Sequence, residues 1–231
     1  MKTAVLTGAS SGIGKAISLR LLELGFAVIG VSRSIQIQDF NDVNFTAIQA
    51  DLCDKDSTLK LCETLKRTSV HILINCAGFG RFEPHEELNT QTIIDMTFLN
   101  LTSPMLLTKT LLRSLKSNDG YLININSIEA IRPSKFAGVY SATKAGLKAF
   151  SDSLFEETRK SGLSITNINP DMTESSFYDG LRFETSAKEN EKLLSSDIAD
   201  ALEHILKMRK GAVVSDYTLR SLHFGISKKK L

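Results

Sequence analysis

Short apolar runs rich in β-branched residues alternate with longer helical patterns through almost the whole 231-residue chain. Runs such as AVIGV are continuously apolar, which is typical of strands that are covered on both faces. A chain that alternates strand and helix in this way forms a parallel sheet with helices on both sides. The sequence therefore predicts a doubly wound α/β fold, a three-layer sandwich around a seven-stranded parallel sheet.

No linker, repeat or low-complexity segment divides the chain, so residues 1–231 are expected to form one domain. The segment 171–196 has no clear pattern, and segments of this length in compact domains are often binding loops. We expect it to border a substrate site, and its short, polar character favours an open one. Lys228, Lys229 and Lys230 are expected to form a solvated, frayed tail. The predicted strands are 3–7, 27–32, 45–50, 70–75, 121–126, 164–168 and 212–216, and the predicted helices are 12–24, 57–67, 91–116, 138–160 and 197–209.

Charge and composition narrow the class of partner. The formal net charge of +2 gives no reason to expect a nucleic-acid surface. The sequence has no uncharged run long enough to span a bilayer, and no apolar stretch typical of a signal peptide follows the first residues. Cys53, Cys62 and Cys76 lack the spacing of metal ligands and fit buried free thiols in a reducing compartment. We therefore expect a cytoplasmic protein without a metal, nucleic-acid or membrane partner.

A glycine-rich turn, TGASSGIG, lies between the first predicted strand and the first predicted helix. Gly8, Gly12 and Gly14 permit positive backbone dihedrals and a close approach of the backbone to a ligand. The helix that follows directs free N–H groups and the positive end of its dipole at the turn, which favours a phosphate. A tight turn with a purely structural role would use the same glycines.

The end of the second strand indicates which dinucleotide fits. In a Rossmann-type unit this position lies beside the adenosine ribose, where a carboxylate would accept from the 2′-hydroxyl. Here Ser32 and Arg33 occupy it, and the next carboxylate is Asp39. Arginine offers planar, charge-assisted donors to a 2′-phosphate. This favours NADP(H) over NAD(H). The alternative is that Arg33 is an ordinary solvated residue.

Tyr140 and Lys144 lie one turn apart at the start of a predicted helix and therefore share a face. Their spacing alone favours a surface pair over a proton donor with a neighbouring cation. The order of the other motifs changes this interpretation.

The chain resembles the short-chain dehydrogenase/reductase family over roughly residues 3–216. TGASSGIG resembles the family's cofactor turn, NCAG at 75–78 resembles its Asn-Asn-Ala-Gly element with Cys76 in place of the second asparagine, and Asp51-Leu52 resembles its adenine-contacting pair. The family's catalytic four match Asn100, Ser127, Tyr140 and Lys144 in order and spacing. The residues expected to bind the cofactor are Gly8, Ser10, Ser11, Gly12, Ile13, Gly14, Ser32, Arg33, Asp51, Leu52, Asn75, Ala77, Gly78, Tyr140, Lys144, Pro170, Met172 and Thr173.

The resemblance implies that Tyr140 exchanges a proton with a carbonyl oxygen while a hydride reaches the carbon. A free tyrosine has a pKa of roughly 10, and a nearby Lys144 ammonium is expected to lower the pKa of Tyr140. Lys144 would also hold the nicotinamide ribose, and Ser127 would orient the substrate oxygen. Pro104 cannot donate to the carbonyl of Asn100, so the helix is expected to kink there, and a water would connect Lys144 to solvent.

The segment NINPDMTESSF resembles the family's Pro-Gly segment, with Pro170 and Thr173 matching and Asp171 in place of the glycine. Glu129 is either a solvated residue or a contact for a polar substrate. The remaining pocket candidates are mostly apolar or aromatic, which suits a hydrophobic carbonyl compound, and core positions would have the same character. These candidates are Phe79, Ile128, Phe136, Val139, Met172, Phe177, Tyr178 and Phe183.

The sequence therefore predicts an NADP-dependent carbonyl reductase or alcohol dehydrogenase acting on a small molecule. Within this class, a 3-oxoacyl-carrier-protein reductase and a sepiapterin- or diketone-type reductase stay open. An inactive NADP(H)-binding sensor or scaffold is the main alternative, and a methyltransferase would leave the tyrosine–lysine pair unexplained. The family resemblance implies a homodimer or homotetramer through helices 91–116 and 138–160, with contacts from Phe150, Leu154 and Phe155.

Overall fold

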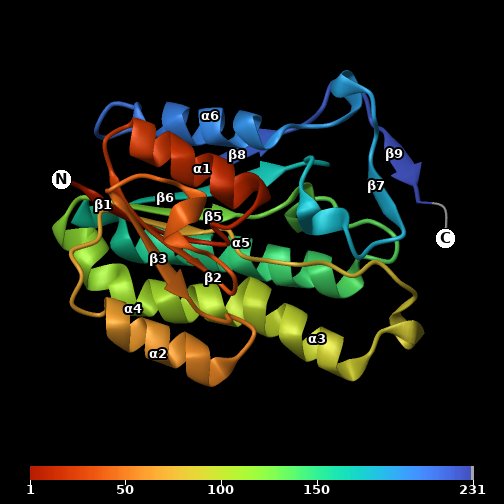
Figure 1. The fold of residues 1–231 in the computed structure, drawn as a ribbon, viewed down its shortest axis with the longest axis horizontal. Coiled ribbons are helices and arrows are strands. Elements are labelled where there is room, and N and C mark those ends of the chain that lie inside the picture. Colours follow the sequence, from red (N-terminus) through yellow and green to blue (C-terminus); the bar gives the residue numbers. More distant parts are fainter. Residues whose placement is uncertain (230–231) are drawn as a thin grey trace.

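The computed structural model describes residues 1–229, and their main feature is a seven-stranded sheet of order β3-β2-β1-β4-β5-β6-β8 (Figure 1). Every neighbouring pair of strands in it is parallel. The order reverses between β1 and β4, which creates a crevice at the carboxyl ends of the strands. The predicted Rossmann-type fold is confirmed. The strands are β1 Thr3–Thr7, β2 Ala27–Ser32, β3 Phe45–Gln49, β4 Ile72–Asn75, β5 Tyr121–Ile125, β6 Ser164–Pro170 and β8 Asp216–Leu219.

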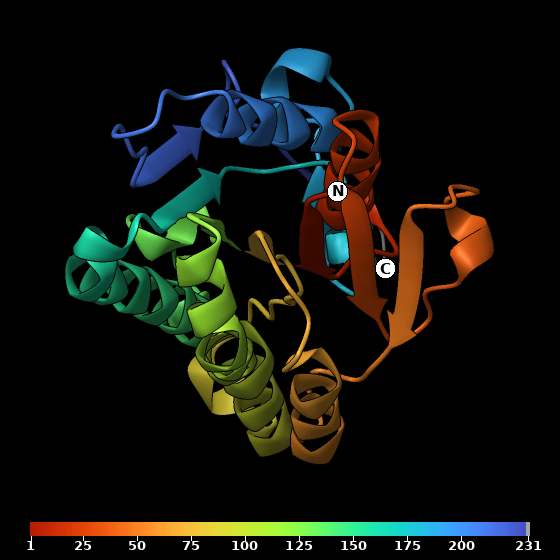
Figure 2. The ribbon, with the colours of Figure 1, turned by 90° about the vertical axis from the view of Figure 1, so that its left-hand side faces the viewer.

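Helices cover both faces of the sheet, and each layer has its own apolar core (Figures 1 and 2). On one face, Ile17 and Leu21 of α1 pack with Ile198 and Leu202 of α6. On the other face, α2, α4 and α5 bury leucines against the sheet, as Leu111 does. The sandwich of three layers follows from strands that are apolar on both sides. The helices are α1 Gly12–Glu23, α2 Lys55–Leu65, α3 Thr90–Thr97, α4 Ser103–Ser117, α5 Gly138–Thr158 and α6 Ser195–Leu206.

The predicted helix 91–116 consists of two α-helices joined by a π-helical turn, Phe98–Thr102. At its end the N–H of Ser103 donates to the carbonyl of Phe98, five residues earlier. Pro104 follows at once and has no N–H to continue the regular pattern. The irregularity that the sequence predicts at Asn100 is present, and it takes the form of a wider turn inside a continuous helix.

The last strand of the sheet was predicted at 212–216 and is found at Asp216–Leu219, so that prediction is wrong by about one strand length. The apolar residues before it leave the turn at Gly211, whose φ is +92°, and lead up to the sheet. Pairing with β6 begins only where Asp216 lies opposite Asn167. As an edge strand, β8 has every second side chain exposed, which gives it a less apolar sequence than the central strands have.

A second, two-stranded sheet forms where the sequence predicted only a loop and a frayed tail. β7, Phe183–Thr185, lies in the predicted substrate loop and pairs antiparallel with β9, Ile226–Lys228 (Figure 1). Lys229 then donates from Nζ to the carbonyl of Tyr178 over 2.6 Å. The prediction of a frayed tail is therefore wrong for Lys228 and Lys229, because strand pairing and the bond from Lys229 hold this segment. The side chain of Lys228 is exposed to solvent as predicted, and Lys230 lies outside the described residues.

Within residues 1–229, no helix is both long and apolar enough to cross a membrane.

Candidate active site

The glycine turn forms one end of a cavity of about 590 Å³ at the carboxyl ends of the strands. Gly8 and Gly12 have φ of +72° and +50°, and a Cβ on Gly14 would lie 2.0 Å from the carbonyl oxygen of Gly8. Ser11 precedes α1 in an extended conformation, and its side chain does not cap the helix. The first N–H groups of α1 therefore remain available to a phosphate.

Thr7, the last residue of β1, ties this turn to the next strand and was not singled out from the sequence. Its hydroxyl accepts from the backbone N–H groups of Cys76 and Ala77 at 3.0 and 3.1 Å. A Cβ on Gly8 would lie 3.0 Å from the backbone of Ala77. The two loops that flank the switch point are thus held together by one threonine and one glycine.

Ser32 and Arg33 lie at the end of β2 and line the same cavity. The Ser32 hydroxyl oxygen is buried and has no hydrogen-bond partner within residues 1–229. A buried hydroxyl without a partner is costly, and a ligand that bonds to it removes the cost. The structure also gives Arg33 no ion pair within residues 1–229.

Most of the predicted site residues line this one cavity, although they come from seven separate segments of the chain. Asn75, Asn100 and Met172 do not line it. Asn75 is buried and donates from Nδ2 to Asn124. The sulfur of Met172 accepts a hydrogen bond from the hydroxyl of Tyr178. The predicted residues that do line it are Gly8, Ser10, Ser11, Gly12, Ile13, Gly14, Ser32, Arg33, Asp51, Leu52, Ala77, Gly78, Ser127, Tyr140, Lys144, Pro170 and Thr173.

Tyr140, in the first turn of α5, is buried with 7% of its surface exposed. Burial raises its pKa above the ordinary value, and hydrogen bonding with Ser127 acts in the opposite direction. The expected lowering of this pKa by Lys144 is not seen in the protein alone. The ammonium nitrogen lies 5.8 Å from the centre of the tyrosine ring, and desolvation of the phenolate is the larger effect.

Lys144 extends its ammonium group into the protein, where Nζ donates to the carbonyl of Ile125 over 2.8 Å. Burial lowers the pKa of this lysine to about 8. A Cβ on Gly78 would lie 3.5 Å from Nζ, so the 76–78 loop passes close to the ammonium group. The lysine is therefore a buried cation directly behind Tyr140, and the surface-pair interpretation of this motif is wrong.

Asn100, in the π-helical turn, connects three parts of the site. Its Oδ1 accepts from the N–H of Phe79 at 3.1 Å, and its Nδ2 donates to the carbonyl of Phe79 at 2.9 Å. Nδ2 also lies 3.2 Å from the hydroxyl of Thr143, which in turn donates to the carbonyl of Tyr140. The side chain thereby fixes the loop after β4 against the first turn of α5.

Ser127 lies just after β5, and its hydroxyl accepts from the N–H of Glu129 at 3.2 Å. The carboxylate of Glu129 accepts from the hydroxyls of Ser134 and Ser141 at 2.7 and 2.6 Å. Glu129 therefore anchors the loop between Ser127 and α5, a role that the sequence did not predict. The sequence offers no signal for this, because Ser141 becomes a partner only when the loop folds back.

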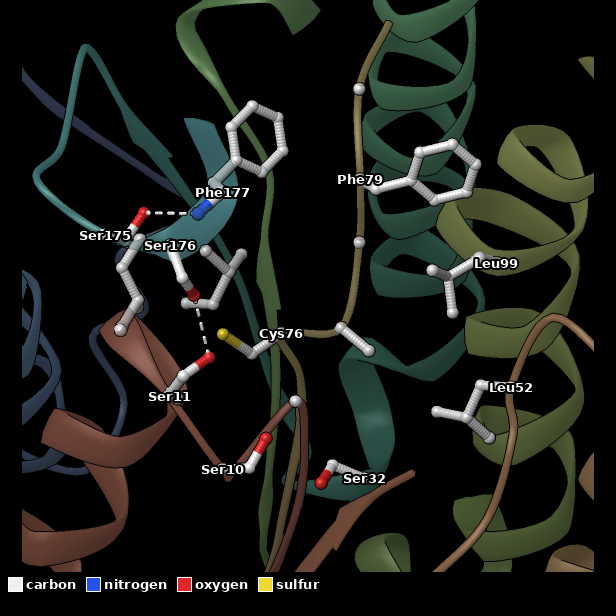
Figure 3. Close-up of a pocket in the computed structure, with 18 of the residues that line it drawn as sticks. Ser10, Ser11, Ser32, Leu52, Cys76, Phe79, Leu99, Ser175, Ser176 and Phe177 are labelled. Carbon is white, nitrogen blue, oxygen red and sulfur yellow. Dashed lines mark hydrogen bonds between the residues drawn. The ribbon is translucent and has the colours of Figure 1, made fainter. Parts of the chain in front are cut away.

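The predicted substrate loop packs against the site through contacts that its polar sequence did not reveal. Ser176 donates to Ser11 at 3.1 Å, which joins the loop to the glycine turn (Figure 3). A Cβ on Gly12 would lie 2.8 Å from Cβ of Ser175. The ring of Phe177 lies 5.8 Å from that of Tyr140. Leu181 and Leu193 of this loop are buried, whereas Leu194 is exposed, a distribution that the average composition of the loop does not show.

Cys76, which replaces the second asparagine of the resembled Asn-Asn-Ala-Gly element, also lines the cavity, near Ser11 and Ser176 (Figure 3). Burial raises the pKa of its thiol to about 12, so the group is neutral at physiological pH. The three cysteines are free thiols, and only Cys62 among them is fully buried.

A glycine cradle, a switch-point crevice and a buried tyrosine–lysine–serine group define a nucleotide-binding oxidoreductase of the doubly wound class. The family model for the short chain dehydrogenases matches residues 2–185. The chain belongs to the short-chain dehydrogenase/reductase family.

Similar proteins support this assignment over the full length. An uncharacterized oxidoreductase of Staphylococcus epidermidis is 31% identical over 229 residues, which cover 95% of this chain and 96% of that protein. A 3-oxoacyl-[acyl-carrier-protein] reductase of Buchnera aphidicola is 31% identical, with 94% of each chain covered. Among solved structures, the alcohol dehydrogenase of Thermococcus sibiricus complexed with 5-hydroxy-NADP has a TM-score of 0.86 and 26% identity, and covers 96% of this chain and 97% of that one.

Proposed function

We propose that this protein is an NADP-dependent oxidoreductase that interconverts a carbonyl compound and an alcohol, with Tyr140 as the general acid and base. The observation that carries this proposal is that Ser127, Tyr140 and Lys144 line the same cavity as the glycine turn. A cofactor-binding scaffold would need the glycine turn alone. The lysine could serve cofactor binding alone, but a serine and a tyrosine hydroxyl beside it are explained by an exchange of protons.

The residues of the cavity fit a dinucleotide. The glycine turn and the uncapped N-terminus of α1 would hold the diphosphate, and the unpartnered Ser32 hydroxyl with Arg33 would receive the adenosine ribose phosphate. Lys144, Pro170 and Thr173 would contact the nicotinamide end, as the family resemblance implies. When bound, NADPH supplies the hydride.

The protein's own residues handle the proton. Ser127 donates to the carbonyl oxygen of the substrate and holds it beside the phenol of Tyr140. Tyr140 gives its proton to that oxygen, which becomes the alcohol hydroxyl, and a phenolate remains on the enzyme. Lys144 stabilises the phenolate through its positive charge. Asn100 keeps the loop after β4 in place against α5 while this happens.

Replacement of Tyr140 by phenylalanine tests the acid–base role. A panel of ketones, aldehydes, a diketone and an acetoacetyl thioester is reduced with NADPH by the wild-type protein, and the Tyr140→Phe variant is expected to lose about 10²- to 10⁴-fold in kcat. NADPH binding, followed by its fluorescence, is expected to persist, because the phenol is not its main contact. Unchanged turnover in the variant would overturn the mechanism, and binding without turnover by the wild-type protein would favour the scaffold.

The preference for NADP(H) depends on Arg33. A charge-assisted hydrogen bond contributes about 1.5–3 kcal/mol, so Arg33→Ala is expected to weaken NADPH binding by roughly 10- to 150-fold and to leave NADH binding almost unchanged. Arg159→Ala is a matched control, since Arg159 lies elsewhere with its side chain 60% exposed. An equal loss for both cofactors in Arg33→Ala would remove the assigned role.

A further inference from the structure

Charged side chains line the cavity at both of its ends. Asp51, Asp95 and Arg33 all act through their charges on the pKa of the Cys53 thiol, so they lie together at the end where the adenosine is proposed to bind. The charges that belong to the other end must therefore be sought among the remaining residues. The charged residues of the lining are Arg33, Asp51, Arg81, Asp95, Lys144 and Asp171.

Arg81 differs from the other charged residues outside the adenosine end because it has no charged or mechanistic partner. Lys144 is bound to the carbonyl of Ile125 behind Tyr140, and the carboxylate of Asp171 lies 3.4 Å from Arg220. Within residues 1–229, Arg81 has no ion pair. Its guanidinium is a positive charge on the cavity wall that the described residues do not neutralise.

Arg81 belongs to the end of the cavity where Tyr140 lies. A Cβ on Gly80, the residue before it, would lie 2.9 Å from the ring of Phe177. That ring lies 5.8 Å from the ring of Tyr140, and the ring of Phe82, the residue after Arg81, lies 5.4 Å from the same tyrosine. Both chain neighbours of Arg81 therefore pack against the rings that surround the proposed proton donor.

The side chain of Arg81 is partly buried and is held in place by the substrate loop. Its Nη1 donates to the carbonyl of Gly180 over 3.3 Å, and a Cβ on Gly180 would lie 3.2 and 3.3 Å from Nη1 and Nη2. This bond uses one N–H of the guanidinium, and no other residue in the described part of the chain accepts from it. The free edge of the planar group offers parallel donors, which match the two oxygens of a carboxylate.

The charge at this end of the cavity also favours a carboxylate over a phosphate. A phosphate monoester carries a charge of about −1.5 to −2 at pH 7, whereas a carboxylate carries a single charge. Among residues 1–229, Arg81 is the cation of the lining that is left to balance it.

We propose that Arg81 binds a carboxylate of the substrate, so that the preferred carbonyl compounds are oxo acids. The carbonyl oxygen would lie at Ser127 and Tyr140, and the carboxylate would lie at the free edge of the guanidinium. This inference rests on the proposed function, because it assigns the substrate class of the same site. The carboxylate should raise kcat/KM by roughly 10- to 150-fold over a neutral analogue, the range expected for a charge-assisted hydrogen bond.

The test compares oxo acids with their own methyl esters, which keep the carbonyl group and remove the charge. Acetoacetate, levulinate and succinic semialdehyde place the carboxylate at different distances from an aldehyde or ketone. The ratio of kcat/KM, acid over methyl ester, is measured with NADPH for the wild-type protein and for Arg81→Met, which keeps an unbranched apolar side chain. We expect the wild type to prefer at least one acid over its ester, and Arg81→Met to lower that ratio by about 10- to 150-fold.

Two further variants show that the effect belongs to the guanidinium of Arg81. Arg182→Met is the matched control, because Arg182 lies in the same loop as Gly180, is exposed and does not line the cavity, so its ratio should equal that of the wild type. Arg81→Lys keeps the charge and loses the planar fork, so its ratio should fall less than that of Arg81→Met. A purely structural bond from Arg81 to Gly180 would affect acid and ester alike. A ratio that Arg81→Met leaves unchanged, or a wild type that prefers no acid over its ester, overturns the inference.

A binding measurement separates failure of this inference from failure of the proposed function. Calorimetric titration of each acid and each ester into the protein saturated with NADP⁺ reports binding without turnover, because no hydride is available to the carbonyl group. Tighter binding of an acid than of its ester that is lost in Arg81→Met and kept in Arg182→Met supports the inference, even if no compound is reduced and the proposed function fails. Equal binding of every acid and its ester overturns the inference, even if the protein reduces both.

Discussion

At the scale of single residues, Lys144 is the side chain whose burial has the clearest measurable consequence. Only 4% of its surface is exposed, and its pKa falls from 10.5 to about 8 because burial disfavours the charged form. The same burial keeps a cation next to Tyr140. A group that is useful to a reaction is therefore held at a cost in stability.

Replacement of Lys144 by methionine should relieve that cost. A shift from 10.5 to about 8 corresponds to about 3 kcal/mol at neutral pH, so Lys144→Met without cofactor is expected to be more stable than the wild type by up to about 3 kcal/mol. Between pH 8 and 10.5 the unfolded wild-type chain binds this proton and the native chain does not, so wild-type stability rises with pH. The advantage of the variant should therefore shrink across this window. Urea unfolding at several pH values measures it.

The control for this prediction is Lys66→Met, because Lys66 has its side chain 62% exposed and loses little on folding. Its difference from the wild type should stay flat between pH 8 and 10.5. Tyr140 also titrates at high pH, in the opposite direction. Its raised pKa keeps the native phenol protonated between pH 8 and 10.5 in all three proteins, so its contribution cancels in the comparison. An advantage of Lys144→Met that does not depend on pH would contradict the burial of the ammonium group.

Site residues could be predicted from the sequence where only one type of amino acid fits the position. Gly14 is readable from the sequence because a Cβ there would lie 2.0 Å from the carbonyl oxygen of Gly8. Thr7 and Thr143 were missed, since threonine is common and its hydroxyl gains partners only from distant segments. The raised pKa of Tyr140 was missed for a similar reason, because the depth of burial depends on Phe82 and Phe177.

At the scale of elements, asparagines join neighbouring strands on the face that α5 covers. Asn75 of β4 lies opposite Asn124 of β5, and Asn75 Nδ2 donates to Asn124 Oδ1 over 2.8 Å. Asn124 in turn donates to Ser151 of α5 over 2.7 Å. Hydrogen bonds of this kind lower the cost of burying polar side chains in a strand that is covered on both faces, although Asn75 Oδ1 has no partner within residues 1–229.

Asn124→Leu is expected to destabilise the protein by about 1–3 kcal/mol, because the amide of Asn75 loses its acceptor in a buried position. The double variant Asn75→Leu/Asn124→Leu removes both partners and should be more stable than the sum of the two single changes predicts. Urea unfolding at neutral pH gives the three free energies. Strict additivity would show that the Asn75–Asn124 bond contributes nothing of its own.

The ends of a helix or strand could be predicted where the run of apolar residues in the sequence has the same ends as the hydrogen-bonded element. The pattern placed α1 and β1 almost as the structure has them, since burial alone decides those elements. It misplaced β8, because an edge strand is defined by pairing with β6, which the local sequence does not reveal. The π-helical turn was predicted only as an irregularity. Pro104 shows that the carbonyl of Asn100 loses its donor, but it does not indicate that the N–H of Ser103 bonds to the carbonyl of Phe98 instead.

At the scale of the whole molecule, the order of strands and the second sheet both depend on contacts between distant segments. The sequence and the family resemblance predicted seven parallel strands with helices on both faces, and the structure adds the order of the strands. The resemblance did not supply β9, which lies beyond the matched residues 2–185. Assembly into a homodimer or homotetramer stays a prediction. Leu154, expected at that contact, is buried in the core of its own chain, and Phe150 and Phe155 pack partly against the same core.

β9 is the part of the chain that connects the C-terminal segment to the active site, so its removal should affect the site without affecting the sheet. A chain that ends at Gly225 loses the pairing of β9 with β7 and the bond from Lys229 to Tyr178. Residues 176–185 should then exchange amide hydrogens faster, since their order depends on that pairing. The KM for a ketone should rise several-fold, because the rings of Phe183 and Tyr178 are no longer held against those of Phe82 and Phe177.

NADPH binding and the midpoint of urea unfolding should change little in this shortened chain, since β9 touches neither the glycine turn nor the main core. Lys229→Met is the milder companion, which keeps the strand and removes one hydrogen bond, and its effect on exchange should be smaller. If amide exchange in 176–185 is the same in all three proteins, the loop holds its place through Ser176 and its own packing against Tyr140, and β9 has no part in shaping the substrate site.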